Sequence, residues 1–289
     1  MKKEPKLRMM DITLGNKNLV HLAYFDVLGF EKKFEKEGLE GMYEIYKELI
    51  NLINENTGKH GYFVDEHEDL GELYEQNKAF FTALNNGFWA TTKVSSYYSS
   101  DSILLWMPWH HKTAKLFCDV CIKFFCEALK MELPLRGCIG YGSVIFDEEK
   151  HIFLGQPLID CVRGEGVQDW LGVSFSSNTL DSVSTNPKGG YKYTDVKQIF
   201  PLPIPNYQVK GKDEKEQEEN GKLLSPFVLD WARYWRENNL GDIEAMFVKM
   251  NTSKKAAIYY DKALDFYKTS EKLEKWYELP FWKDKFDNM

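Results

Sequence analysis

Two aspartates and one arginine stand at positions where a folded chain could use them for chemistry. Asp26 follows the apolar run at 19–25, and Asp101 lies between two β-rich runs, at the tip of a predicted hairpin. Arg163 is the lone basic residue of a helical pattern over 156–170. Hard divalent cations need carboxylate oxygens, and an arginine from another element can neutralise charge that develops during phosphoryl transfer. These residue types therefore favour metal-assisted phosphoryl transfer.

The elements that must position these residues follow from the apolar patterns around them. The run at 19–25 predicts a central strand, and a turn at Gly29 leads into a helical pattern over 31–54. Further along the chain we expect a hairpin over 93–107, a helix over 112–131, a long hairpin over 135–154, a helix over 156–170 and a strand over 171–176. This order predicts an α+β fold, in which helices cover a mostly antiparallel sheet in the ferredoxin-like arrangement.

Composition divides the chain into a main domain, a loop and an extension. The main domain is expected over 18–200, and the polar, acidic stretch 58–78 within it is predicted to be a surface insertion. Residues 201–222 include three prolines and the charged stretch KGKDEKEQEENGK, which is typical of a flexible charged loop. Residues 223–289 are predicted to form a terminal strand and a helical extension.

Charge, hydropathy and cysteine content limit the classes of partner. The 289 residues carry 37 Lys and Arg against 44 Asp and Glu, a net charge of −7, which disfavours a surface that coats nucleic acid. Apolar runs such as ILLWM at 103–107 are far shorter than the roughly 18–20 residues that span a bilayer, so we expect no membrane association. Five cysteines, an odd count, and a polar start without a secretory signal predict a reducing, cytoplasmic setting.

Four motifs in order resemble the catalytic domain of the class III nucleotidyl cyclases. They are FDVLGF at 25–30, SSDSILLW at 99–106, LRGCIGYG at 135–142 and LGQPLIDCVRGE at 154–165. The resemblance covers roughly residues 18–180. It implies that Asp26, the backbone of Val27, and Asp101 hold two Mn²⁺ or Mg²⁺ ions at each site. The expected activity is therefore the cyclisation of a nucleoside triphosphate.

The same resemblance assigns roles to the remaining site residues. The backbone of Leu28, Gly29 and Phe30 would lie against the triphosphate, and Arg163 falls at the arginine that stabilises the transition state. In this family two subunits share each active site, one giving the aspartates and the other the arginine. A homodimer with two composite sites is therefore expected.

Several positions depart from the family pattern. Ser100 stands where the family has a glycine before the second aspartate, and Ile159 stands where it has a ribose-orienting asparagine. Tyr97 replaces the base-selecting lysine of adenylyl cyclases, and Ile152 replaces its acidic or thiol partner. A bulky phenol occupies part of the space that a purine would need. Tyr97 and Ile152 are therefore predicted to contact a smaller base.

The sequence as a whole is similar to the bacterial pyrimidine cyclases of Pycsar anti-phage signalling systems. By this resemblance the substrate is UTP or CTP, with UTP as the first assignment, and the product is cyclic UMP or cyclic CMP. That product would activate a separate downstream effector. No nucleic acid partner is implied.

Simpler interpretations exist for each of these residues. Asp26 could be a helix N-cap or a loop carboxylate, and Arg163 could pair with Glu165 or Asp160. Tyr97 could simply pack within its strand. The cysteines at 118, 121 and 126 share a helical face with apolar residues, which favours a core over zinc, and the glycines at 137, 140 and 142 are typical of strand packing. Arg136, at the start of the same strand, could support the site or the dimer, with a structural role as the default.

Three other functions compete with a pyrimidine cyclase. A purine cyclase would build its base pocket from residues other than Tyr97 and Ile152. A catalytically inactive cyclase-like module would bind nucleotide or dimerise without turnover, although two placed carboxylates argue against it. A metal-dependent nuclease also uses paired acids, but the sequence has no lysine-bearing acidic strand motif.

Overall fold

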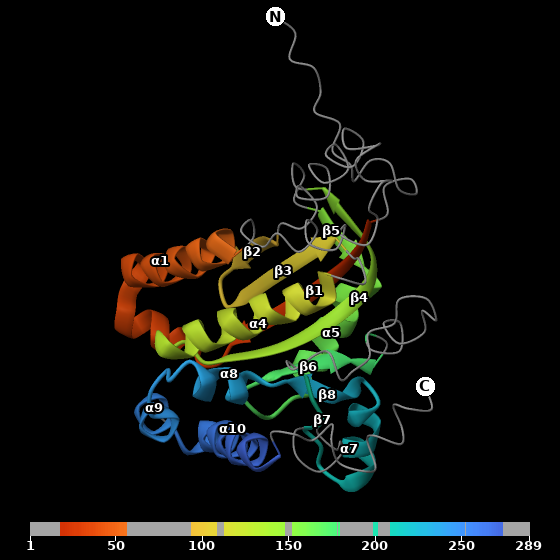
Figure 1. The fold of residues 1–289 in the computed structure, drawn as a ribbon. Helices are drawn as coiled ribbons and strands as arrows, with labels where there is room; N and C mark the ends of the chain where they lie inside the picture. Colours follow the sequence, from red (N-terminus) through yellow and green to blue (C-terminus); the bar gives the residue numbers. More distant parts are fainter. Residues whose placement is uncertain are drawn as a thin grey trace, which may run out of the picture.

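The computed structural model of the chain describes most of the predicted main domain and part of the C-terminal extension (Figure 1). The described residues are 18–56, 94–108, 113–147, 152–177, 179, 199–201, 209–251 and 253–273. The surface insertion predicted at 58–78 lies outside the described residues.

One sheet organises the described part of the chain. Its strands lie in the order β2–β3–β1–β4–β6–β8–β7, and β5 pairs with β4 beside this path. The strand bounds are β1 (Asn18–Val27), β2 (Ser95–Ser99), β3 (Ser102–Pro108), β4 (Leu135–Asp147), β5 (Ile152–Gly155), β6 (Val173–Ser176), β7 (Ile199–Pro201) and β8 (Leu224–Leu229). Paired strands are antiparallel, except for β4 and β6, which are parallel. The predicted α+β class and mostly antiparallel sheet are therefore confirmed.

Helices cover both faces of this sheet (Figure 1). Their bounds are α1 (Phe30–Asn56), α4 (Thr113–Lys130), α5 (Gln156–Gly166), α7 (Glu214–Gly221), α8 (Trp231–Glu237), α9 (Ile243–Met250) and α10 (Lys254–Lys272). Because successive side chains of a strand point to opposite faces of the sheet, β1 contributes side chains to two hydrophobic clusters, one on each face. Phe25 packs on Phe124 of α4, with ring centroids 5.2 Å apart, whereas Leu22 belongs to a second cluster with Cys161 of α5. Each such fully buried side chain contributes roughly 1.5–3 kcal/mol.

The turn between β1 and α1 places Asp26 next to the start of a helix. Gly29 has φ 71°, a left-handed conformation that glycine adopts without strain. The Lys33 amide then donates to the Gly29 carbonyl at 3.2 Å and closes the first turn of α1. The strand, tight loop and helix predicted around FDVLGF are therefore present.

Helix α5 approaches β4 closely because glycines remove side chains from their contact. A Cβ at Gly140 would lie 2.7 Å from Cys161 Sγ, and one at Gly164 would lie 2.7 Å from Cys138 Sγ. All five cysteines are free and buried, and for Cys118, Cys121 and Cys126 this agrees with the core position predicted from the sequence. Burial raises the pKa of the Cys161 thiol. The tight contact fixes the position of the residues that α5 presents to the rest of the domain.

The structure differs from the sequence prediction in the segment 201–222. Part of this segment forms α7, because Asp213 caps the helix by accepting a hydrogen bond from the Glu216 amide at 2.9 Å, while the Lys212 amide donates to the Glu216 carboxylate at 2.8 Å. The predicted terminal strand is β8, and it joins the same sheet as β1. No helix in the described residues is both long and apolar enough to cross a bilayer.

Candidate active site

The backbone brings Asp26 and Asp101 together at one end of the sheet. Asp26 lies opposite Ser102 in the pairing of β1 with β3, and the Val27 amide donates to the Asp101 carbonyl at 2.9 Å. Both aspartates therefore project from neighbouring chain segments. Their joint influence is visible at Tyr46, whose pKa is raised by burial and, to a smaller extent, by the charges of Asp101 and Asp26.

The hairpin that carries Asp101 has a two-residue turn made of Ser100 and Asp101, since Ser99 pairs with Ser102. Ser100 has φ 55°, in the left-handed region, so the glycine of the cyclase pattern would relieve strain at this position. The Tyr46 hydroxyl of α1 donates to the Ser100 carbonyl at 2.5 Å and holds the turn against the helix. The serine is thus held in a two-residue turn beside Asp101.

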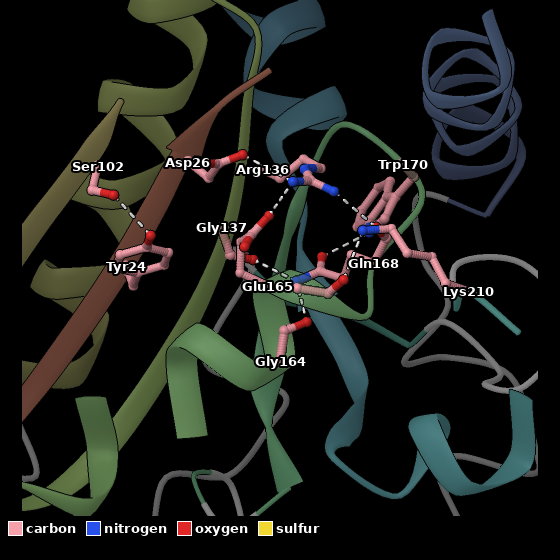
Figure 2. Close-up of polar contacts among 11 residues, drawn as sticks. Tyr24, Asp26, Ser102, Arg136, Gly137, Gly164, Glu165, Gln168, Trp170 and Lys210 are labelled. Carbon is pink, nitrogen blue, oxygen red and sulfur yellow. Dashed lines mark hydrogen bonds and ion pairs between the residues drawn. The ribbon is translucent and has the colours of Figure 1, made fainter. Parts of the chain in front are cut away.

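Arg136, which from the sequence could support the site or the dimer, forms a charged cluster with Asp26 and with Glu165, a residue that the sequence did not assign to the site. Arg136 Nη2 lies 2.9 Å from Asp26 Oδ2 and 2.6 Å from Glu165 Oε1, and Nη1 donates to the Gln168 carbonyl at 3.1 Å (Figure 2). The guanidinium also lies 5.4 Å from the ring centroid of Tyr259 in α10. Arg136 is 8% exposed and Glu165 6% exposed. A buried cation thus links the candidate metal ligand Asp26 to α5 and to the C-terminal extension.

The electrostatics of this cluster favour the neutral form of one carboxyl group. Burial raises the pKa of Glu165 to about 7, against the lowering influence of Arg136 and with a smaller rise from the charge of Asp26. Lys210 approaches from the other side, where its Nζ donates to the Gly166 carbonyl at 2.7 Å. Burial and then the charge of Arg136 lower the pKa of Lys210. The cluster therefore contains a carboxyl group that titrates near neutral pH.

The donor atoms present fit a hard divalent cation bound together with a phosphate substrate. The Asp26 and Asp101 carboxylates are oxygen donors at one edge of the sheet, and Mg²⁺ sites in phosphoryl-transfer enzymes commonly use one or two carboxylates plus substrate phosphates. Among the described residues no cluster of three or more His, Cys, Asp or Glu side chains could hold a metal by itself. Arg136 already pairs with Asp26 Oδ2, so a cation would share this carboxylate with the guanidinium.

The predicted phosphate loop has two kinds of backbone amide. The Leu28 amide donates to the Pro134 carbonyl at 2.9 Å, which ties the loop to the start of β4. Gly29 is exposed, and Phe30 begins α1, whose first amides have no partner within the helix. The amides at the start of α1 are thus the ones suited to a phosphate group, whereas the Leu28 amide serves the fold.

Arg163 lies on the outer face of α5, away from the buried cluster. Its neighbours on this face, Ile159 and Val162, are 45% and 42% exposed. The two carboxylates considered as its ion-pair partners interact elsewhere, since Glu165 pairs with Arg136 and Asp160 accepts a hydrogen bond from Gln156 at 2.8 Å. In the described part of the chain, no interaction joins Arg163 to Asp26 or Asp101. One chain alone therefore does not assemble the predicted catalytic set.

The two residues predicted to contact the base, Tyr97 of β2 and Ile152 of β5, do not face each other. The Tyr97 ring packs on Phe153, with centroids 5.0 Å apart, within a cluster that includes Trp106 and Phe146. Because strand neighbours alternate, Ile152 faces away from the side that Phe153 presents to Tyr97, and it is 40% exposed. Strand packing of Tyr97 is therefore observed, and a base contact remains a prediction.

Comparisons with known proteins assign no family to the chain. No known family model matches the chain, and no curated protein sequence matches it. What the fold and site define is an α+β domain with two aspartates on neighbouring chain segments at one end of the sheet, beside the start of a helix.

Proposed function

We propose that the chain is a metal-dependent pyrimidine nucleotide cyclase that converts UTP or CTP, with UTP as the first assignment, to the 3′,5′-cyclic monophosphate and pyrophosphate. The observation that carries this proposal is the adjacency of Asp26 and Asp101, one at the end of β1 and the other in the β2–β3 turn. The partial strand order β4–β1–β3–β2 gives further support, because it is the order of the ferredoxin-like arrangement expected for class III cyclases.

The residues at this end of the sheet have distinct roles in the proposed reaction. Asp26 and Asp101, with the Val27 carbonyl, would hold two Mg²⁺ or Mn²⁺ ions, which would lower the pKa of the ribose 3′-hydroxyl and neutralise phosphate charge. The amides of Gly29 and Phe30 would bind the triphosphate at the start of α1. The 3′-oxygen then attacks the α-phosphorus as the bond to pyrophosphate breaks.

Arg136 is proposed as a positioning residue for Asp26. Its fork-shaped guanidinium fixes the orientation of one carboxylate oxygen, and Glu165 balances the buried charge. Since Oδ2 pairs with Arg136, Asp26 Oδ1 would be the oxygen that holds a metal ion. The contact with Tyr259 restrains the guanidinium from the side of the C-terminal extension.

A second copy of the chain would supply the arginine that each site lacks. Arg163 stands beside exposed apolar residues of α5, and this apolar surface continues onto β5, where Leu154 is 58% exposed. Such a surface is typical of a contact between subunits. We therefore propose a homodimer in which Arg163 of one protomer completes the site formed by Asp26 and Asp101 of its partner.

Tyr97 supports the proposal of a pyrimidine base because its ring packs against Phe153 and the two form an aromatic wall. An aromatic wall of this kind leaves less room than the lysine of an adenylyl cyclase, so a single-ring base fits better. The cyclic product would act on a separate effector, as in bacterial anti-phage signalling, with the enzyme itself in the cytoplasm.

A product assay tests the proposed activity directly. The purified chain is incubated with ATP, GTP, CTP or UTP and Mn²⁺, and products are identified by mass spectrometry. We expect a cyclic pyrimidine monophosphate, lost by at least ~100-fold in Asp26→Ala and Asp101→Ala and retained in Asp261→Ala, an exposed carboxylate of α10. A cyclic purine would overturn the base assignment, and no product from any nucleotide would favour an inactive cyclase-like module.

Mixing two inactive variants tests the shared site. Asp26→Ala and Arg163→Ala proteins should each be inactive, and mixed dimers should regain activity because they contain one intact site. Absence of rescue, with subunit exchange demonstrated by a tagged copy, would contradict the composite site while leaving the metal ligands unaffected.

A further inference from the structure

A basic cavity lies beside the phosphate loop, between the start of α1 and the helices of the C-terminal extension. Its volume is about 390 Å³, within the range of small-ligand sites. Leu28 and Gly29 form part of its wall, and Met250, Tyr259 and Tyr260 contribute from α9 and α10. The cavity is thus lined by residues of the extension as well as by residues of the main domain.

The charged side chains that line this cavity are mostly cations. Five are lysines, against a single glutamate, in a chain whose net charge is −7. The lysines are Lys32, Lys33, Lys36, Lys249 and Lys255. Because like charges that converge repel one another, this arrangement stabilises the protein only when an anion offsets it.

The fold itself neutralises only part of this positive charge. Glu132 is shared by two lysines, Lys36 at 3.3 Å and Lys249, and this pairing lowers the pKa of the Glu132 carboxyl group. Lys33 pairs with Glu37 at 3.1 Å and donates to the Met131 carbonyl at 3.0 Å.

Two further lysines are left over. Lys32 and Lys255 have no ion pair within the part of the chain that the structure describes, and both are exposed. They stand on α1 and α10, so an anion between them would join the main domain to the extension.

The chemistry of the lining selects phosphate groups. Lysine binds phosphate as a compact positive charge with several donors, and lysines from separate helices can reach different phosphates of one ligand. The first turns of α1 and α10 also border the cavity at Gly29 and Ser253, where helix N-termini favour anions. Five cations exceed the need of a single phosphate ion.

We propose that this cavity binds an anion with two or more linked phosphates, held chiefly by Lys32 and Lys255. Inorganic pyrophosphate, tripolyphosphate and the tail of a nucleoside triphosphate share this chemistry. The site does not depend on the proposed cyclase activity, because the lysines recognise phosphate charge and not a reaction. It is nevertheless coupled to the candidate active site through Tyr259, which lines the cavity and contacts Arg136.

Calorimetric titration of the full chain with pyrophosphate, in EDTA and at low salt, tests this site without metal-dependent binding. We expect saturable binding that weakens as KCl is added. Lys32→Gln and Lys255→Gln should each weaken it by about threefold to tenfold, and the double variant by at least about tenfold, since each removes a charge-assisted contact. The matched control Lys254→Gln changes an exposed lysine of the same helical turn that lies outside the cavity lining, and should change affinity less than about twofold.

Further ligands and one further variant separate the possible outcomes. Tripolyphosphate should bind at least as tightly as pyrophosphate, and inorganic phosphate more weakly. Tighter binding of UTP than of tripolyphosphate would assign the site to a nucleotide. Asp101→Ala should leave pyrophosphate affinity in EDTA unchanged. The inference is overturned if no phosphate compound binds, or if the double lysine variant binds pyrophosphate as tightly as the wild type.

The two proposals can fail separately. Lysine-dependent pyrophosphate binding without any cyclic product would retain the cavity assignment and reject the cyclase. A cyclic product that depends on Asp26, without metal-free pyrophosphate binding, would do the opposite.

Discussion

Replacement of Arg136 by methionine gives the sharpest test of the buried charged cluster. Arg136 pairs with Asp26 at 2.9 Å and with Glu165 at 2.6 Å, and both Arg136 and Glu165 are almost fully buried. Methionine keeps the bulk of the side chain but removes the charge. Breaking a buried pair by removing one partner costs about 3–5 kcal/mol when the other partner stays charged.

The protonation of Glu165 modifies this magnitude and makes it depend on pH. Burial already raises the pKa of Glu165 to about 7, and loss of the lowering influence of Arg136 would raise it further. The folded variant then holds a proton that the unfolded chain, with its ordinary carboxyl pKa near 4.5, has released. Stability from this group is present below the unfolded pKa and is lost as pH rises through the folded pKa. Above pH 7 the variant should therefore lose stability relative to the wild type, by up to about 1.4 kcal/mol per pH unit, until the pH reaches the variant's own raised Glu165 pKa.

Urea unfolding at pH 6, 7, 8 and 9, followed by tryptophan fluorescence, measures both effects. The second substitution Glu165→Gln in the Arg136→Met background should abolish the extra pH slope, because it removes the titrating group. As a control, Lys222→Met breaks an exposed i,i+4 pair with Glu218 at 3.5 Å and should cost less than about 1 kcal/mol at every pH. A cost of less than about 1 kcal/mol for Arg136→Met, without a pH slope, would refute the reasoning.

Three further substitutions test packing, base selection and assembly. Gly140→Ala should destabilise the protein by about 1–3 kcal/mol in calorimetry, because the new Cβ would lie 2.7 Å from Cys161 Sγ. The control Gly166→Ala should have little effect, because its Cβ would meet nothing within 4 Å. Equal costs of the two substitutions would contradict the close contact at Gly140. Tyr97→Ala should raise turnover of purine relative to pyrimidine triphosphates, and an unchanged ratio of products would remove Tyr97 from the base pocket. Val162→Glu should shift the protein to a monomer in light scattering with loss of cyclase activity, and a fully active dimer would place the interface elsewhere.

The elements of the main domain could be predicted because their signals are local. The apolar run before Asp26 gives β1, and the polar pair Ser100 and Asp101 between β-rich runs gives the β2–β3 turn. The apolar face of the helix that holds Cys118 gives α4. The resemblance to cyclases predicted that Asp26 and Asp101 hold the same metal ions and so lie near each other, which local patterns do not indicate.

Arg136 and Glu165 could not be assigned to the site in the same way, because their meeting depends on strand register. Arg136 lies directly opposite Asp26 in the pairing of β1 with β4, and a shift by one residue would turn its side chain to the other face. A charged residue at the start of an otherwise apolar strand was the available signal. Helix α7 was missed for a different reason, since composition predicted a loop while the capping pattern of Asp213 and Glu216 favoured a helix.

The C-terminal extension is part of the site and not a separate appendage. Strand β8 lies between β6 and β7 in the sheet, and Trp231 at the start of α8 packs on Phe125 of α4. From α10, the Tyr259 carbonyl accepts a hydrogen bond from the Leu171 amide at 3.3 Å, while its ring contacts Arg136. The guanidinium that pairs with Asp26 is therefore in contact with a helix more than one hundred residues away in the chain. It follows that the chemistry of the β1 edge and the stability of the extension are physically coupled.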